Sequence, residues 1–201
     1  MTMIEPLPET ALILETERLR LTPLSPDDLD IAQRVLCDPR VMHYVSDEMT
    51  PEAVVSHMKD AVKRGAGGRI GIWCITRKDT GEKIGDGVLT PVPIDEDDTD
   101  WTQVVPDAYP QSQIEVGYLF VPEAWGRGFA TETCARLLRF AFEMTDLPEV
   151  VATTDPENVN SQHVLKKCGM RSIGRKRAYG YDDVEWLEVT REEWNAQASN
   201  Q

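Results

Sequence analysis

The stretch IEVGYLFVPEAWGRGFATETCARLLRFAFEM, residues 114–144, carries the pattern from which we predict the fold. Its opening segment, IEVGYLFV, is strongly apolar and predicts a buried strand. Its closing segment predicts an amphipathic helix, because one stripe of it carries Ala130, Cys134, Leu137, Leu138 and Ala141. Two glycines, Gly126 and Gly128, stand between these segments. A flexible turn therefore leads from a strand into a helix N-terminus.

That turn has the features of an anion site. The first backbone N–H groups of a helix have no partner inside the helix, and the helix dipole adds about half a positive charge there. Glycines let an anion approach this backbone, so the turn with Arg127 is a candidate pyrophosphate cradle. A tight turn without a ligand is the alternative. No Gly-Lys-Ser/Thr closes the pattern, and Thr131 replaces the third glycine of GxGxxG, which disfavours nucleotide triphosphates and dinucleotides.

The segments before this stretch alternate between strand and helix patterns. ETERLRLTPL (15–24) predicts a strand, SPDDLDIAQRVLCD (25–38) a helix with a capping box, and TPEAVVSHMKDAVKRG (50–65) a helix ended by Gly65. RIGIWCITRKDTGEKIGDGVLTPV (69–92) predicts two antiparallel strands around a turn at residues 79–81. Residues 91–112, rich in Pro and Asp, predict a long acidic loop or insertion.

The segments after it complete one domain. EVVATT predicts a strand, ENVNSQHVLKKCG a capped helix, and MRSIGRKRAYG with VEWLEVT a closing pair of strands, while residues 195–201 predict a frayed tail. We therefore expect a single α+β (mixed α/β) domain over residues 1–201, with its core at about 11–194. A central mixed, mostly antiparallel sheet should be flanked by helices.

The composition argues against several classes of binding partner. The net charge of −14 argues against nucleic acid and anionic membranes, since phosphate binding needs a basic surface. No apolar run approaches the ~20 residues of a membrane span, and the start lacks a signal core, so we expect a cytoplasmic protein. Four scattered cysteines and three histidines without metal-ligand spacing predict reduced thiols and no metal. We take His43, His57 and His163 as packing or surface residues.

Three motifs in order resemble the GNAT superfamily of acetyl-CoA-dependent N-acetyltransferases, and within it the branch of ribosomal-protein N-terminal acetyltransferases called RimJ/RimL-like. They are LETERLRLTPLSPDD, IEVGYLFVPEAWGRGFATE and NVNSQHVLKKCGM, and the resemblance spans nearly the whole chain. It implies a single GNAT-like domain that uses acetyl-CoA as co-substrate, without a metal.

The resemblance implies the cofactor contacts. The family's phosphate loop reads Gln/Arg-x-x-Gly-x-Gly/Ala; Gly126 and Gly128 match, while Glu123 takes the Gln/Arg position and puts a carboxylate near a phosphate. Asn158 and Ser161 share a helix face and are either a helix cap with a solvated serine or contacts to the pantetheine arm. The implied cofactor-binding set is Val121, Trp125, Gly126, Arg127, Gly128, Phe129, Ala130, Asn158 and Ser161.

Two side chains are candidates for the chemistry. A thioester is attacked by a neutral amine, so the acceptor must lose a proton. Glu115 shares a strand face with Gly117 and Leu119, and a carboxylate beside apolar surface suits a general base; the alternative is an exposed strand entrance. A backbone N–H near Val116 or Gly117 would support the thioester oxygen. Ser161 would assist the departing thiolate, while Leu165 stands where many GNAT branches carry a tyrosine acid.

The sequence is compatible with more than one kind of acceptor. The acidic run at 95–100 is either a solvated loop or an electrostatic guide for a cationic acceptor, such as a small-molecule amine or a protein N-terminus. The rival to an acetyltransferase is a non-catalytic acyl-CoA-binding or regulatory module with the same fold. A phosphate-loop hydrolase lacks its lysine. A homodimer is a common arrangement for soluble enzymes, and the sequence does not fix the oligomeric state.

Overall fold

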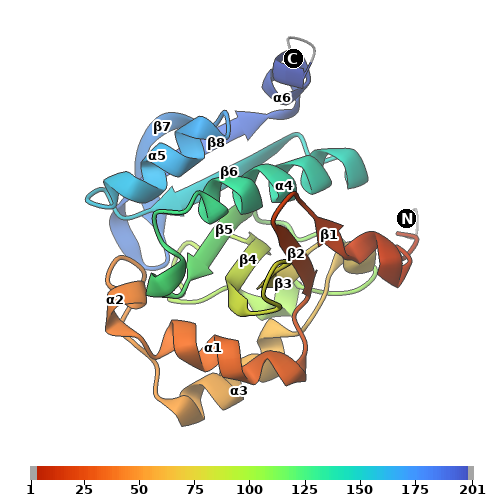
Figure 1. The fold of residues 1–201 in the computed structure, drawn as a ribbon. Coiled ribbons are helices and arrows are strands. Elements are labelled where there is room, and N and C mark those ends of the chain that lie inside the picture. Colours follow the sequence, from red (N-terminus) through yellow and green to blue (C-terminus); the bar gives the residue numbers. More distant parts are fainter. Residues whose placement is uncertain (1–3, 199–201) are drawn as a thin grey trace.

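The computed structural model describes residues 4–198, which form one sheet covered by helices on both faces (Figure 1). The strands of the sheet are β1 (Leu14–Glu15), β2 (Leu19–Pro23), β3 (Gly71–Arg77), β4 (Lys83–Pro91), β5 (Ile114–Phe120), β6 (Glu149–Thr154), β7 (Arg171–Ala178) and β8 (Tyr181–Thr190). The α-helices of the described residues are α1 (Leu29–Leu36), α2 (Pro39–Met42), α3 (Pro51–Ala61), α4 (Phe129–Met144), α5 (Val159–Lys167) and α6 (Arg191–Ala198).

The strand order is β1-β2-β3-β4-β5-β6-β8-β7, and neighbouring strands are antiparallel except for β5 and β6. This confirms the predicted α+β (mixed α/β) domain with a mixed, mostly antiparallel sheet. The parallel pair is unusual because only Glu115 and Val151 face each other as ladder partners. Beyond that point the two strands diverge, which opens the middle of the sheet.

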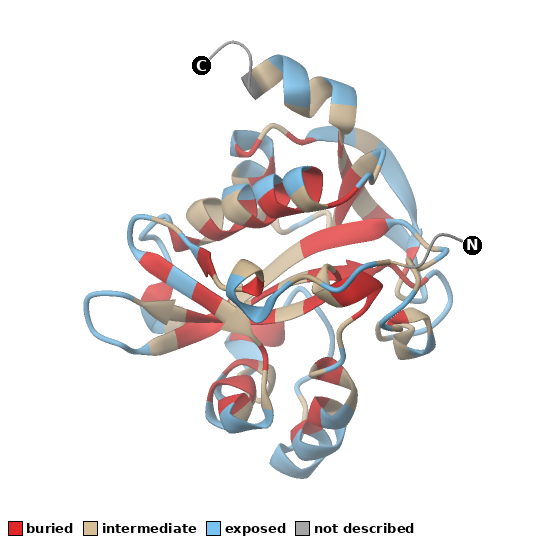
Figure 2. Ribbon diagram, turned by 90° about the vertical axis from the view of Figure 1, so that its right-hand side faces the viewer, coloured by how far each residue is buried: buried red, intermediate tan, exposed pale blue. Residues whose placement is uncertain are grey.

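Each face of the sheet has its own helices (Figures 1 and 2). Helix α4 packs closely on one face, where a Cβ added to Gly87 would lie 2.9 Å from Leu137 Cδ1. Trp73 meets Phe140 of α4 edge to face, with ring centroids 5.4 Å apart. Helices α1 and α3 pack on each other, and α1 contacts β4. Buried side chains line the surfaces between sheet and helices, so the core lies in two layers.

The predicted helix starts are confirmed with small shifts. Ser25 and Asp28 form the expected capping box, although a 3-10 turn precedes α1. The Thr50 side chain accepts a hydrogen bond from the Ala53 amide and caps α3, which ends at Ala61, four residues before Gly65. The short helix α2 was not predicted, because a single turn shows no period.

The C-terminal segment differs from the frayed tail that the sequence predicts from Asn195. Helix α6 continues through Ala198. Thr190 and Glu193 exchange capping hydrogen bonds at its start, and Trp194 stacks on Phe142 with ring centroids 5.3 Å apart. The Thr-x-x-Glu capping pattern at residues 190–193 could therefore have predicted this helix from the sequence. Residues 199–201 lie outside the described part of the chain.

The acidic segment at 91–112 is largely a loop, as predicted, with one 3-10 turn at Trp101–Gln103. In residues 4–198, no helix is long and apolar enough to cross a membrane. Across the same residues, no group of three or more His, Cys, Asp or Glu side chains is arranged to hold a metal ion.

A glycine in β4 tests the contact between the central strands. A Cβ at Gly85 would lie 2.1 Å from the Leu119 carbonyl oxygen and 2.9 Å from Phe120 Cα, both backbone atoms of β5. We expect Gly85→Ala to lower the free energy of unfolding by about 3 kcal/mol, since the strands must move apart. Urea denaturation measures the loss. The control, Gly126→Ala, meets no atom within 4 Å and should lose only ~1 kcal/mol for its left-handed φ; equal losses would contradict this packing.

Candidate active site

A cavity of 720 Å³ opens where β5 and β6 diverge. Its walls come from β4, β5 and β6, from α1, α2, α3 and α5, and from the hairpin between β7 and β8. After Glu115, no residue of β5 has a ladder partner in β6, so this edge of the strand can bind a ligand. The volume suits a small organic ligand.

Glu115 lies inside this cavity and is buried. Thr153 of β6 donates a hydrogen bond of 2.9 Å to Glu115 Oε2, and the Tyr179 hydroxyl donates to Oε1. Burial raises the pKa of Glu115 to about 8, partly offset by the Thr153 hydrogen bond. The structure therefore excludes the alternative in which Glu115 marks an exposed entrance of the strand. With this pKa, the carboxyl can exchange a proton near neutral pH.

The glycine turn has the backbone shape of an anion cradle. Gly126 and Gly128 have left-handed φ values of 70° and 79°, and a Cβ at Gly126 would meet no atom within 4 Å. The first helical hydrogen bond of α4 runs from the Glu132 amide to the Gly128 carbonyl. The amides of residues 129–131 precede it, point outward at the helix N-terminus and remain available to a phosphate.

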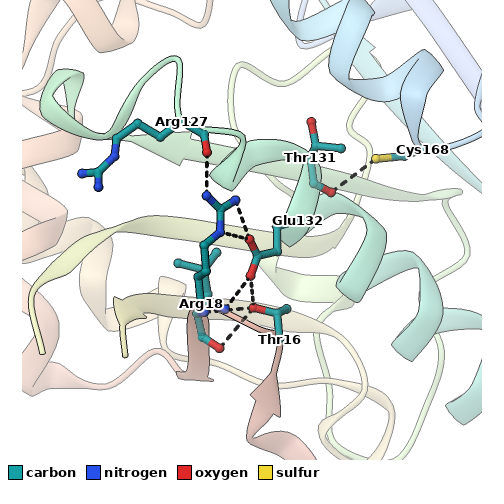
Figure 3. A network of polar contacts seen from close by, with 7 residues as sticks. Thr16, Arg18, Arg127, Thr131, Glu132 and Cys168 are labelled. Atoms are coloured by element: carbon teal, nitrogen blue, oxygen red, sulfur yellow. Dashed lines mark hydrogen bonds and ion pairs between the residues drawn. The ribbon is translucent and has the colours of Figure 1, made fainter. Parts of the chain in front are cut away.

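Arg18 fixes this turn from outside (Figure 3). Its Nη1 donates to the Arg127 carbonyl at 2.8 Å, and its Nε donates to Glu132 Oε2 at 2.7 Å. Thr16 also donates to Glu132. Burial opposes ionisation of Glu132, but the hydrogen bonds from Thr16 and Arg18 outweigh it and lower the pKa of this carboxyl. The loop carbonyl is thereby turned toward Arg18, away from any anion.

The other predicted cofactor residues lie along the same turn. Val121 and Phe129 are buried and anchor its two ends. Trp125 is 49% exposed, and its indole donates to the Phe120 carbonyl at 2.8 Å. Arg127 and Ala130 follow at the surface of the turn. None of residues 121–130 lines the cavity, so the turn and the cavity are separate parts of the site.

Asn158 and Ser161 do line the cavity. Asn158 caps α5 by accepting from the Ser161 amide at 3.1 Å, so its oxygen has the capping role and its amide group remains for a ligand. The Tyr118 hydroxyl lies 3.4 Å from Ser161 Oγ. Burial raises the pKa of Tyr118 above its ordinary value, which keeps it a proton donor. Tyr118 was not predicted as a site residue; Leu165, by contrast, is a buried cavity residue without a hydroxyl.

Sequence reasoning also missed a polar cluster on the α3 side. Although taken as packing or surface, His57 lines the cavity, with Nδ1 3.4 Å from Asp98 Oδ2. The Asp98 hydrogen bond raises the pKa of His57. Burial raises the pKa of Asp86, also in the cavity, to about 7 against the pull of the nearby His57 charge. His57 falls on the same helix face as buried Val54 and Ala61, which could have indicated its direction.

The cavity is strongly acidic. No lysine or arginine is among the described residues that line it. The carboxyl side chains that line it are Asp47, Asp86, Asp97, Asp98, Glu115, Asp155, Asp182 and Asp183. Part of the 95–100 run therefore faces the cavity rather than bulk solvent alone.

Comparison with known proteins gives a consistent picture. Residues 18–171 match the family described as "Acetyltransferase (GNAT) domain". FsC-acetyl coenzyme A-N(2)-transacetylase of Aspergillus fumigatus is 30% identical over 193 residues, which cover 90% of this chain and 77% of that protein.

Solved structures share the fold. Spermidine N-acetyltransferase of Vibrio cholerae, in complex with CoA and spermine, aligns with a TM-score of 0.68 at 17% identity, covering 90% of this chain and 99% of that one. RimL, a ribosomal L7/L12 alpha-N-protein acetyltransferase, aligns with a TM-score of 0.66 at 15% identity, covering 89% and 97%. With the family match over most of the chain, these findings show that this chain belongs to the GNAT acetyltransferase family.

Proposed function

We propose that this protein transfers the acetyl group of acetyl-CoA to a cationic primary amine by direct attack, with Glu115 accepting the amine proton. The observation that carries the proposal is a buried carboxyl in the cavity with a pKa of about 8. Lysine-like amines titrate near ~10.4 and α-amino groups near ~8, so both arrive largely as ammonium ions that must lose a proton before attack. Glu115 accepts it directly or through one water.

The glycine turn and α5 are the proposed cofactor contacts. Amides at the start of α4 bind the diphosphate, and Gly126 and Gly128 leave room for it. Asn158 and Ser161 contact the arm that leads to the thioester. Acetyl-CoA supplies an activated acyl group on a good leaving group. Glu123 is exposed beside the turn, and its carboxylate weakens but does not prevent phosphate binding.

Two hydroxyls serve the leaving-group side. Tyr118 and Ser161 lie within 3.4 Å of each other on the α5 wall of the cavity. We assign this pair to hydrogen bonding with the departing thiolate. Free amides on the edge of β5 near Val116 and Gly117 support the oxygen of the thioester.

The acceptor enters from the α3 side, through the acidic part of the cavity. Asp86 and Glu115 occupy one face of the sheet, because Asp86 pairs with Leu119 and Thr90 pairs with Glu115. Four residues along a strand separate these two register positions by about 13 Å. An acceptor that carries a second positive charge can therefore pair with Asp86 while its reactive amine lies at Glu115.

Replacing Glu115 tests the base. We expect Glu115→Gln to lower kcat about 100-fold at pH 8, because the amide accepts no proton. Wild-type kcat should rise as pH passes through about 8, where the carboxyl ionises, and the variant should lack that rise. Thiol release from acetyl-CoA with a panel of amines measures both. An unchanged rate from pH 6 to 9 removes the assignment; CoA binding without release from any amine favours the non-catalytic module.

The acidic side chains that line the cavity predict how the KM of an acceptor depends on the acceptor's own charge. Octylamine and its diamine counterpart, 1,8-diaminooctane, are a matched pair of acceptors, because only the diamine has a second ammonium. We expect Asp86→Asn to raise the KM for the diamine several-fold and the KM for octylamine much less. Raising NaCl from about 0.05 to 0.5 M should raise the KM for the diamine in wild type, through screening. Steady-state kinetics at fixed acetyl-CoA measures both effects. Equal changes for the two amines, or none with salt, would refute this role of the wall.

A further inference from the structure

A tyrosine occupies an unfavourable position in the tight turn between β7 and β8. Tyr179 and Gly180 join Ala178 to Tyr181, and both have left-handed φ values, 53° and 74°. Turns of this kind favour Gly, Asn or Asp at both central positions. A bulky side chain at positive φ is strained, so its retention calls for a gain elsewhere.

The turn is fixed to a distant part of the chain. The Tyr179 amide donates to the Pro93 carbonyl at 3.1 Å, and the Gly180 amide donates to the Ile94 carbonyl at 3.0 Å. Arg177 Nε lies 2.9 Å from Asp95 Oδ1. These contacts hold the turn against the loop that follows β4, so the tyrosine ring has a defined direction.

That direction leads into the cavity. Tyr179 lines it, and its hydroxyl donates to Glu115 Oε1, while Thr153 donates to Oε2. Each carboxyl oxygen of Glu115 thus has one donor, from strands or turns far apart in the sequence. A carboxylate held at both oxygens keeps one orientation, and each oxygen retains lone pairs for an incoming proton.

We propose that Tyr179 is a positioning residue for acetyl transfer, whose hydroxyl holds the Glu115 carboxylate in its proton-accepting orientation. This inference rests on the proposed function, because it assigns Tyr179 a role only through Glu115. It also gives the strained turn its purpose: the left-handed backbone at Tyr179 is the conformation that brings the hydroxyl to the carboxylate.

The effect should be visible in the pH dependence of the rate. The groups around Glu115 are uncharged hydroxyls from three elements: Thr90 of β4, Thr153 of β6 and Tyr179 of the turn. Charged and titratable groups face the same cavity from other elements: His43, Asp47, His57 of α3, Asp86 of β4, Asp97, Asp98, Asp155, and Asp182 and Asp183 of β8. A hydroxyl that donates to the carboxylate stabilises its ionised form, so loss of the Tyr179 hydroxyl should raise the pKa of Glu115.

The test is the kcat profile of Tyr179→Phe from pH 6 to 10, with any amine that wild type acetylates. We expect the midpoint of the rising limb to move up by about one pH unit, since hydrogen bonds to charged groups have this strength. The rate at pH 7 should fall about tenfold, while the rate near pH 10 and the KM for acetyl-CoA stay close to wild type. A profile that overlays wild type, or a loss of equal size at every pH, overturns the proposal.

Further variants separate the causes. Tyr109→Phe, outside the cavity, should leave the profile unchanged. Tyr179→Gly removes the same hydroxyl at a backbone position that glycine adopts without strain, so it should shift the profile as Phe does. In a Glu115→Gln background, Tyr179→Phe should have no further effect on kcat; an additive effect overturns the coupling. If Glu115→Gln is impaired while Tyr179→Phe keeps the wild-type pH profile, this inference alone is refuted. If Glu115→Gln is fully active, the proposed function is refuted as well.

Discussion

Strands β5 and β6 face each other at one residue pair, Glu115 and Val151, and the active site depends on that interrupted pairing. A parallel ladder that continued would consume the backbone groups at the centre of the sheet and close the cavity. Because the strands part immediately after Glu115, the carboxyl lies at the base of the opening. The same divergence lets α5 approach from β6 while the glycine turn follows β5. One irregularity in the sheet thus places both halves of the site.

The site also works against the stability of the fold. A folded-state pKa of about 8 for Glu115 means that folding disfavours its ionised form. The unfolded chain ionises this carboxyl near ~4.3, so its contribution to stability falls as pH rises from there toward 8, and stays at its lowest value above that. The strained turn at Tyr179 has a similar character. Both features reduce stability at residues that belong to the proposed site, as is common for functional sites.

Local signals in the sequence predicted much of this molecule. The caps at Ser25 and Thr50, the apolar strand at 114–120 and the glycine turn each depend on residues close together in the chain. The direction of Glu115 followed from strand alternation. His57, Tyr118 and Tyr179 were not predicted as site residues, because their roles arise from partners 41, 43 and 64 positions away. Such contacts are set by the order of strands in the sheet, which short-range patterns do not contain.

We propose that the diverging strands and the glycine turn together form a coenzyme A site. Isothermal titration of coenzyme A into the folded protein tests it most directly, with Gly128→Val measured alongside. We expect one binding site per chain in wild type and affinity at least about tenfold lower in the variant, because a branched side chain at a left-handed position disrupts the cradle. Absence of binding heat with folded wild-type protein, or equal affinity in the variant, would contradict it.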